Sequence, residues 1–481
     1  MNYVNNATLL KRELMVRLAK MVFEKKTDQI NRLPIELFPK NNPAIRCCVH
    51  KDRAVTKYRL MALMGHGAED EQDELRPLSD YYNTAMERQE VKEPVLTVMD
   101  DACSSCVKGQ YFVSNACQGC VARPCMLNCR KEAVTMENGR AKIDPEKCVN
   151  CGICMQECPY HAIIYIPVPC EEACPVNAIS KDENGKEQID FEKCIFCGKC
   201  MRECPFGAIT ERSQLVDVLK HLTSDKPLVA MIAPAIVGQF SADMPQIVSA
   251  LKTLGFDEVV EVAQGADATV QHETAEFAER LQRGEAFMTT SCCPSYTEAV
   301  NKHIPNLKPN VSDTATPMHY TAQFVRTTWP DSLNVFIGPC VAKRHEALND
   351  ELVDLVLSFE ELGALFIAKR IDVQKCTPAD SSYTGTRWGR GFPVSGGVTE
   401  AIKRSTDVEL NPVLVDGLSK KSLRQLKGFA KECPGNFVEV MACEGGCMAG
   451  PNSICNPRLA NRSLQKLLDE TEDEKVIEQA A

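Results

Sequence analysis

Long apolar segments are missing from this 481-residue sequence, which contains no run of about 18 uncharged apolar residues, the length of a membrane-spanning helix. Its first residues, MNYVNNATLLKRELMVRLAK, carry charges where a signal peptide has a continuous apolar core. We therefore expect a cytoplasmic protein with no membrane partner. A GxGxxG dinucleotide motif is also missing, so any nicotinamide chemistry would occur in a partner. No feature predicts nucleic-acid binding.

The composition excludes a wholly disordered chain, because 44% of the residues are hydrophobic and 25% are charged. A chain of this length is expected to form two to four domains. It contains 26 cysteines, many of them two or three residues apart. In a long chain without an export signal, this spacing favours metal ligation over a disulfide framework.

The first 95 residues read as a helical prefix with an acidic linker. Residues 1–60 contain 13 Lys and Arg but only 5 Asp and Glu. Apolar residues recur there at helical spacing: Leu9, Leu10, Leu14, Leu18, Met21 and Val22. Two interpretations remain open, namely electrostatic steering of an acidic protein partner and an ordinary solvated helix.

Three further regions follow the prefix. Residues 96–212 contain 16 of the cysteines in a repeated pattern, and residues 463–481 form a charged tail. Residues 225–462 alternate helical patterns with the strand-like segments LVAMIAP, AFMTTSC, NVFIGPC and FVEVMAC, which predicts α/β layers with parallel sheets. Ligand sites lie beyond the carboxyl ends of such strands, and three of these four segments end in cysteine.

Two C-x2-C-x2-C-x3-C-P runs, typical of paired 4Fe-4S cubanes, begin at Cys148 and Cys194. A C-x2-C-x4-C-x3-C variant begins at Cys117. Structural zinc is the alternative, although zinc needs only two cysteine pairs. The fourth cysteine of each run is expected to ligate the neighbouring cluster. The predicted ligand sets are Cys117, Cys120, Cys125 and Cys158; Cys148, Cys151, Cys154 and Cys129; and Cys194, Cys197, Cys200 and Cys174.

Four cysteines of this region remain, a number sufficient for one more cubane: Cys103, Cys106, Cys170 and Cys204. Their spacing does not show that they converge, and Cys103 and Cys106 could instead be free thiols in a loop. We therefore expect three to four accessory 4Fe-4S clusters. Five other cysteines are interpreted as structural or free thiols: Cys47, Cys48, Cys376, Cys433 and Cys455.

Three segments of the C-terminal half, TSCCPSY (290–296), GPCVAKRHE (338–346) and EVMACEGGC (439–447), resemble the active-site motifs of iron-only (FeFe) hydrogenases. The resemblance covers about residues 225–460. It implies a ferredoxin hydrogenase that catalyses 2 H⁺ + 2 e⁻ = H₂ at a six-iron H-cluster. The implied fold is an α/β catalytic domain of two lobes, with parallel sheets flanked by helices. Ferredoxin-like α+β cubane domains and a helical prefix would precede it.

The resemblance also implies residue roles. The active-site cubane would be ligated by Cys293, Cys340, Cys443 and Cys447. Cys447 would bridge to a diiron subsite that carries carbon monoxide, cyanide and a dithiolate amine. Lys343 would anchor one cyanide. The turn Ala233, Pro234 and Ala235 would face the other, and Met441 would contact the cofactor.

A proton path is implied beside these ligands. Cys292 would exchange protons with the amine, since a thiol pKa of about 8.5 lies close to neutrality. Glu273, Glu276 and Ser312 would continue the path, and Glu346 would brace Lys343. From sequence alone, however, the two helical glutamates could form a solvated face and Ser312 could be a helix cap.

The motifs depart from the family pattern at several positions. Tyr296 replaces Trp, Gly338 replaces Met, Met318 stands where Gln is common, and CMAGPNS replaces a glycine run. These departures resemble the less-studied monomeric branch. The alternatives are a non-catalytic relative from cytosolic iron-sulfur assembly, a hydrogen sensor, and one subunit of a bifurcating complex. Ferredoxin, or a similar electron carrier, and the hydrogenase maturation enzymes are the expected partners.

Overall fold

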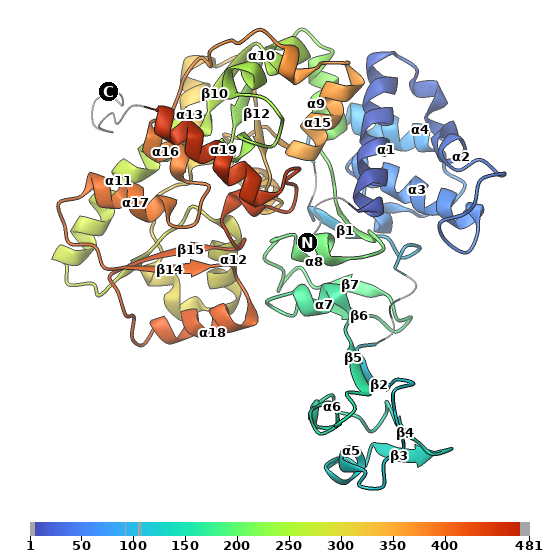
Figure 1. Cartoon of the computed structure of the whole chain (residues 1–481). Helices are drawn as coiled ribbons and strands as arrows, with labels where there is room; N and C mark the ends of the chain where they lie inside the picture. Colours follow the sequence, from blue (N-terminus) through green and yellow to red (C-terminus); the bar gives the residue numbers. More distant parts are fainter. Residues whose placement is uncertain (1–4, 92, 104–105, 107, 472–481) are drawn as a thin grey trace.

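The computed structural model describes residues 5–91, 93–103, 106 and 108–471. Its C-terminal half contains two parallel sheets covered by helices (Figure 1). The strand order is β10-β9-β12-β13 in the first sheet and β11-β15-β14 in the second. The strands are β9 (Leu228–Ile232), β10 (Glu258–Glu261), β11 (Met288–Thr289), β12 (Leu333–Gly338), β13 (Leu355–Ser358), β14 (Pro412–Asp416) and β15 (Phe437–Met441).

All neighbouring strands in these two sheets are parallel, as the alternating pattern predicts. All five residues of β9 and of β15 are buried, because helices cover both faces of a parallel sheet. The covering helices are α9 (Leu215–Leu222), α10 (Met244–Leu254), α11 (Val262–Gln282), α12 (Pro294–His303), α13 (Pro317–Thr328), α14 (Ala342–Leu348), α15 (Phe359–Ala368), α16 (Arg387–Gly391), α17 (Gly397–Ser405), α18 (Lys420–Phe429) and α19 (Pro457–Glu470).

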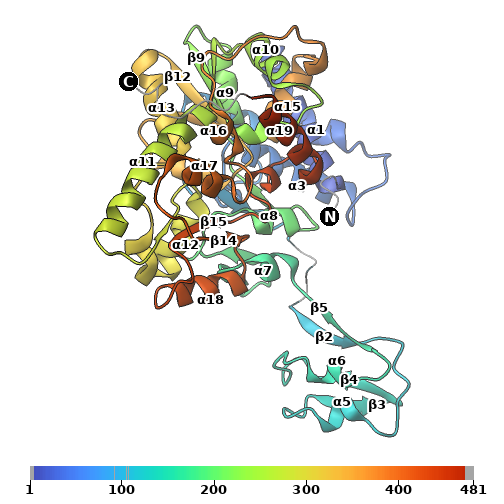
Figure 2. The ribbon, with the colours of Figure 1, turned by 60° about the vertical axis from the view of Figure 1, so that its left-hand side comes forward.

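The cysteine-rich region forms two ferredoxin-like units. Strand β1 (Leu96–Val98) pairs with β8 (Ile209–Glu211) and closes the region at its two ends. The unit of residues 109–166 projects from the body as an arm, whereas the other unit lies against the C-terminal half (Figures 1 and 2). The remaining elements are β2 (Gln110–Val113), β3 (Val134–Glu137), β4 (Arg140–Ile143), β5 (Ile163–Ile166), β6 (Ile179–Lys181), β7 (Glu187–Ile189), α5 (Pro124–Leu127), α6 (Ile153–Gln156), α7 (Pro169–Ala173) and α8 (Lys199–Glu203).

The N-terminal residues form helices that pack against the C-terminal half. The Asn5 side chain caps the first helix by accepting a hydrogen bond from the Thr8 amide at 2.9 Å. This helix contacts α9 and α15 through buried residues that include Leu14 and Leu18, while Leu9 of the predicted apolar face is 51% exposed. The helices are α1 (Asn6–Phe23), α2 (Leu33–Leu37), α3 (Val49–Leu63) and α4 (Leu78–Glu87).

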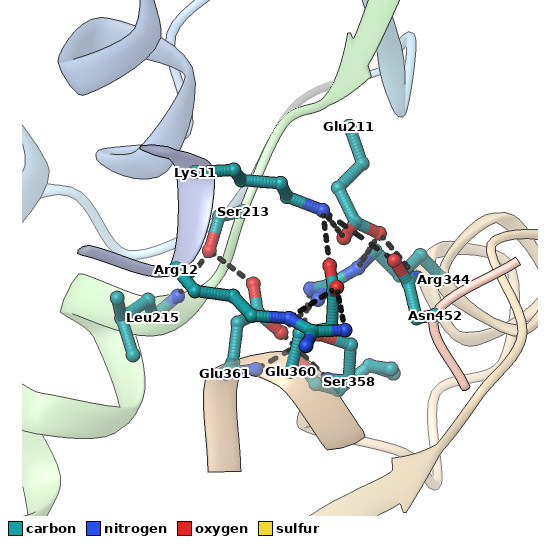
Figure 3. A network of polar contacts seen from close by, with 11 residues as sticks. Lys11, Arg12, Glu211, Ser213, Leu215, Arg344, Ser358, Glu360, Glu361 and Asn452 are labelled. Carbon is teal, nitrogen blue, oxygen red and sulfur yellow. Dashed lines mark hydrogen bonds and ion pairs between the residues drawn. The ribbon is translucent and has the colours of Figure 1, made fainter. Parts of the chain in front are cut away.

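A buried polar network joins the prefix to both other parts of the chain (Figure 3). Lys11 Nζ lies 3.0 Å from Glu360 Oε2 and 3.3 Å from Glu211 Oε1. Arg344 Nε binds the same Glu211 carboxylate at 3.1 Å, and Arg12 pairs with Glu360 at 2.8 Å. Although burial opposes the change, these cations lower the pKa of Glu211. Basic residues of the prefix therefore attach it to the C-terminal half, which neither interpretation from sequence anticipated.

Two expectations change at the level of the fold. The acidic linker is attached, since Glu71 pairs with Lys57 at 2.7 Å and Glu69 binds Arg212. The predicted start of the tail at residue 463 falls inside α19, which continues to Glu470 and buries Leu464. Residues 472–481 of that tail lie outside the described residues. Within the described ranges, no helix has the length and apolar character needed to span a membrane.

Candidate active site and iron-sulfur ligand sets

The four predicted active-site ligands line one cavity between the two sheets. Three of them follow the carboxyl ends of parallel strands: Cys293 follows β11, Cys340 follows β12 and Cys443 follows β15. Cys447 lies at the start of a 3-10 turn in the same loop as Cys443. The location agrees with the rule that ligand sites lie at this edge of parallel sheets.

Burial dominates the electrostatics of these thiols. It raises the pKa of Cys340 and of Cys447 to about 12. Burial and the other three thiols raise the pKa of Cys443 well above its usual value. Four such groups would not lose their protons together without a compensating cation, which a metal cluster supplies. The donor set therefore fits a thiolate-ligated cubane.

The rest of the cavity wall is largely apolar, which excludes water. Ala233, Pro234, Ala235, Met318 and Met441 belong to this wall. The predicted cofactor-contacting residues are thus together on the cavity wall, and so is one of the departures from the family pattern. A second departure, Tyr296, is fully buried and shares a hydrogen bond of 2.7 Å with the Thr289 hydroxyl.

Lys343 reaches the cavity from α14 and is held on two sides. Its Nζ lies 2.7 Å from Glu346 Oε2 and donates to the Thr316 hydroxyl at 3.1 Å. Although burial opposes the change, Glu346 raises the pKa of Lys343, so the ammonium stays charged. The geometry matches the bracing role expected for Glu346. Thr316, which also donates to Glu346, was not anticipated from the sequence.

The adjacent cysteines 292 and 293 have different surroundings. Cys293 packs against the hydrophobic cluster that contains Tyr296, whereas Cys292 packs against the cluster of Val270 and Phe277 on α11. Burial, followed by nearby groups that include Glu273, raises the pKa of Cys292 well above its usual value. The expectation of a thiol pKa near its ordinary value is therefore wrong, and the thiol stays protonated at neutral pH.

Glu273 on α11 is fully buried, which excludes the solvated-face interpretation. Neither of its carboxyl oxygens has a hydrogen-bond partner in the described part of the chain. Burial, and then the charges of Glu276 and Glu439, raise its pKa to about 8, although the Ser312 hydroxyl and the Ser291 backbone lie near enough to oppose this rise. The carboxyl can thus exchange a proton close to neutral pH.

Glu276 continues the line of groups toward solvent. Its carboxylate accepts hydrogen bonds from the Ser312 hydroxyl at 2.6 Å and the Thr314 hydroxyl at 2.8 Å. Although burial opposes the change, these bonds lower its pKa. Ser312 is not a helix cap, since the next helix begins at Pro317. Arg280 joins Glu276 to Asp313, whose side chain is 95% exposed.

Glu439 is a functional candidate to which sequence reasoning assigned no role. It lies on β15, and its buried carboxylate accepts from the amides of Gly396 and Thr399 at 2.7 and 2.8 Å, which secures the loop that contains Pro393 of the cavity wall. Burial raises its pKa. The signal was present in the sequence, because Glu439 is the single charged residue within the buried strand FVEVM.

The three predicted accessory sets also come together. The four cysteines of the first set line one small cavity: Cys117, Cys120, Cys125 and Cys158. In the second set, burial and then the nearby thiols raise the pKa of Cys154; these thiols are Cys148, Cys151 and Cys129. In the third set, burial and then the nearby thiols raise the pKa of Cys200 well above its usual value; these thiols are Cys197, Cys194 and Cys174. Cys197 also lines the active-site cavity, so the third set adjoins the active-site ligands.

The remaining four cysteines converge as well. Burial, then Glu187 and the thiols of Cys204, Cys103 and Cys106, raise the pKa of Cys170 to about 12. Cys103 is 8% exposed, which argues against a free thiol in a loop. No three His, Cys, Asp or Glu side chains in the described ranges are close enough to hold a single metal ion.

A repeated hydrogen bond supports the division into four similar sites. In each half-motif, the amide of the alanine four residues after the last cysteine donates to that cysteine's sulfur, at 3.1 to 3.4 Å. Such bonds stabilise a thiolate ligand. The cysteines that accept them are Cys129, Cys158, Cys174 and Cys204.

Comparisons with known proteins agree with the cysteine pattern. A family described as iron only hydrogenase large subunit, C-terminal domain, matches residues 226–451, and a 4Fe-4S binding domain matches residues 141–164 and 187–210. Iron hydrogenase 1 of Clostridium pasteurianum is 28% identical over 408 residues, which cover 72% of this chain and 70% of that protein.

Two further relatives, a hydrogenase subunit and an assembly factor, are also similar to this chain. The periplasmic [Fe] hydrogenase large subunit of Nitratidesulfovibrio vulgaris is 30% identical over 373 residues, which cover 64% of this chain and 85% of that protein. A probable cytosolic Fe-S cluster assembly factor of Drosophila erecta is 24% identical over 280 residues, covering 45% of this chain and 59% of that protein. With both its cysteine sets and its relatives in agreement, this chain belongs to the iron-only hydrogenase family.

Proposed function

We propose that this protein is a catalytic hydrogenase that interconverts protons, electrons and molecular hydrogen. The observation that carries the proposal is the arrangement around one buried cavity. Four cysteines can ligate a cluster there, and a fifth thiol, Cys292, faces the separate line of Glu273 and Glu276. An assembly factor would need the ligands, but it would have no use for a proton path from the cavity to the surface.

The residues of the chain divide the chemistry between them. When bound, the H-cluster would supply the irons at which protons and electrons combine, held by Cys293, Cys340, Cys443 and Cys447. Lys343 would orient it through a charged hydrogen bond. Cys292 would hold a proton next to the cluster. Glu273, with a pKa of about 8, would pass a proton to that thiol. Glu273 would in turn receive a proton from solvent by way of Glu276 and Ser312.

Electrons would arrive through four accessory cubanes. The set next to the active site is that of Cys197, and the set at the end of the arm is that of Cys120. Exposed apolar side chains surround the ligands on the arm: Val121 (97% exposed), Leu127 (74%), Val149 (60%) and Tyr160 (52%). We propose that a ferredoxin or similar carrier docks at this end of the arm. Basic residues of the prefix, by contrast, are engaged within the chain.

Infrared spectroscopy of protein matured anaerobically, together with hydrogen evolution driven by reduced viologen, tests the proposal. Carbon monoxide and cyanide bands with turnover are expected. Cubane absorption without these bands would favour an assembly or other non-catalytic role. Bands without turnover would favour a hydrogen sensor. We also propose a cytoplasmic location and dependence on hydrogenase maturation enzymes, which expression with and without those enzymes would test.

A further inference from the structure

Arg59 on α3 of the prefix reaches the loop that carries Cys204. Its side chain is 7% exposed. One of its amino groups donates to the carbonyls of Phe206 at 3.1 Å and Gly207 at 3.4 Å. The other, Nη1, has no hydrogen-bond partner in the described ranges. Arg59 and Cys204 line the same cavity of about 330 Å³ between the prefix, α8 and the catalytic half.

No carboxylate of the described residues forms an ion pair with Arg59. Two carboxylates line this cavity with Arg59: Glu360 is occupied by Lys11 and Arg12, and Glu203 forms no ion pair with Arg59 in the described part of the chain. Asp52 lies on the same helix as Arg59, but it pairs with Arg46 at 3.2 Å. The side chain is therefore a buried cation without an anionic partner. Such a group is costly unless a negative charge lies nearby.

Another cation near the fourth cysteine set already has an anionic partner. The charge of Lys181 opposes the rise that burial causes in the pKa of Cys103 and Cys106, and Lys181 forms an ion pair with Glu187. Burial, and then the charge of Arg46, lower the pKa of Arg59 to about 10, while the nearby Cys204 and Asp52 oppose this fall. Arg46 and Asp52 form an ion pair with each other. The Arg59 guanidinium thus stays protonated at neutral pH. It contributes one uncompensated positive charge beside the set.

We propose that Arg59 is the buried counter-ion of the cubane held by Cys103, Cys106, Cys170 and Cys204, and that it raises the reduction potential of this cluster. The inference rests on the proposed fourth cubane. A cubane with four thiolate ligands carries negative charge, which would compensate the buried cation. Reduction adds one more negative charge, so a nearby positive charge favours the reduced state. Arg59 would act on the cluster potential without ligating iron.

Redox titration of the full chain, followed by electron paramagnetic resonance, tests this role. The signal of the fourth cubane is identified as the one that Cys106→Ser removes. Arg59→Met should shift its reduction equilibrium toward the oxidised state by at least about tenfold, or about 59 mV for one electron. Arg59→Lys, which keeps the charge, should stay within about threefold of wild type.

Two further variants control the experiment. Arg17→Met removes an exposed cation of α1 that pairs with Glu13, and it should leave the signal unchanged. Arg59→Gln removes the charge but keeps a donor for Phe206, so it should reproduce the shift even where Arg59→Met loses iron.

Three outcomes would overturn the inference. The first is an unshifted potential in Arg59→Gln with iron content equal to wild type. The second is an equal shift in Arg59→Lys and Arg59→Gln, which would make the hydrogen bonds the cause instead of the charge. The third is a wild-type spectrum with no signal that Cys106→Ser removes. In that case the fourth cubane itself is absent, a failure that iron content distinguishes from the first two.

Discussion

Replacing Glu273 with glutamine should change the pH dependence of stability in a direction opposite to that expected for a carboxylate whose pKa is lowered by an ion pair. The pKa of Glu273 is raised to about 8 in the folded protein, from an ordinary value of 4.5. The folded protein therefore favours the protonated, neutral form of the Glu273 carboxyl more than the unfolded chain does. This contribution to the free energy of unfolding is complete below about pH 4.5 and is lost as the pH rises through about 8.

The magnitude follows from the two pKa values. Between pH 5 and pH 7 the unfolded chain has lost this proton and the folded protein has kept it. Each pH unit then costs about 1.36 kcal/mol, which gives about 2.5 kcal/mol over this window after allowing for incomplete ionisation at pH 5. Glutamine cannot ionise. The stability of Glu273→Gln relative to wild type should therefore improve by about 2.5 kcal/mol from pH 5 to pH 7.

Denaturant unfolding at pH 5, 6 and 7, with matched cluster content, measures this difference. Glu276→Gln is the matched control, because Glu276 lies one helical turn away and its pKa is lowered. Its stabilising contribution is present above the ordinary pKa and is lost as pH falls through the lower folded value. Glu276→Gln should be destabilised by about 2 kcal/mol at pH 5, since Arg280 and Ser312 lose a charged partner. Because the charge of Glu276 is one of the causes that raise the pKa of Glu273, this variant should also weaken the pH dependence of stability, but by less than Glu273→Gln does.

Parallel stability curves for wild type and Glu273→Gln would refute this reasoning, because they would show an ionised Glu273 in the folded protein. Infrared titration gives an independent reading. The carbonyl stretch of a protonated carboxyl should be present at pH 6 and absent from the Glu273→Gln spectrum at the same pH.

Three other predictions concern ligands, the proton path and the attachment of the prefix. Cys292→Ser should keep the diiron infrared bands but lower hydrogen evolution by at least about a hundredfold, whereas Cys293→Ser should lose bands and iron together; wild-type turnover in Cys292→Ser would contradict this. Cys151→Ala should lower bound iron by about four atoms, and unchanged iron would break the proposed second set. Glu360→Gln should lower the free energy of unfolding by about 2 kcal/mol and speed proteolysis of the prefix, while viologen-driven turnover persists; equal proteolysis would remove the attachment role.

Local spacing predicted the three accessory sets, because cubane ligands within a run are fixed by two- and three-residue intervals. The fourth set was only numerically possible from sequence. Cys103 and Cys170 are brought together by strand pairing of β1 with β8 and by contacts of β7, which no local pattern encodes. The parallel strands that end in cysteine were predicted by their continuous apolar residues. Strand β14 was not, since its apolar residues alternate with exposed ones.

The active-site residues were predicted by family motifs, but their protonation was not. The pKa values of Cys292 and Glu273 depend on burial by α11 and on charges from β15, and these are tertiary properties. The same is true of the prefix. Its basic composition was visible in the sequence, whereas the pairing of Lys11 with Glu360 joins residues 349 positions apart.

The arm is topologically an insertion within another unit. Its outgoing strand β2 and returning strand β5 pair with Gln110 opposite Ile166, so the two ends of residues 109–166 lie next to each other. A segment with adjacent ends can be lengthened, exchanged or removed without moving the structure that holds it. Under the proposed function, the arm could therefore be exchanged for one that binds another electron carrier while the C-terminal half stays the same.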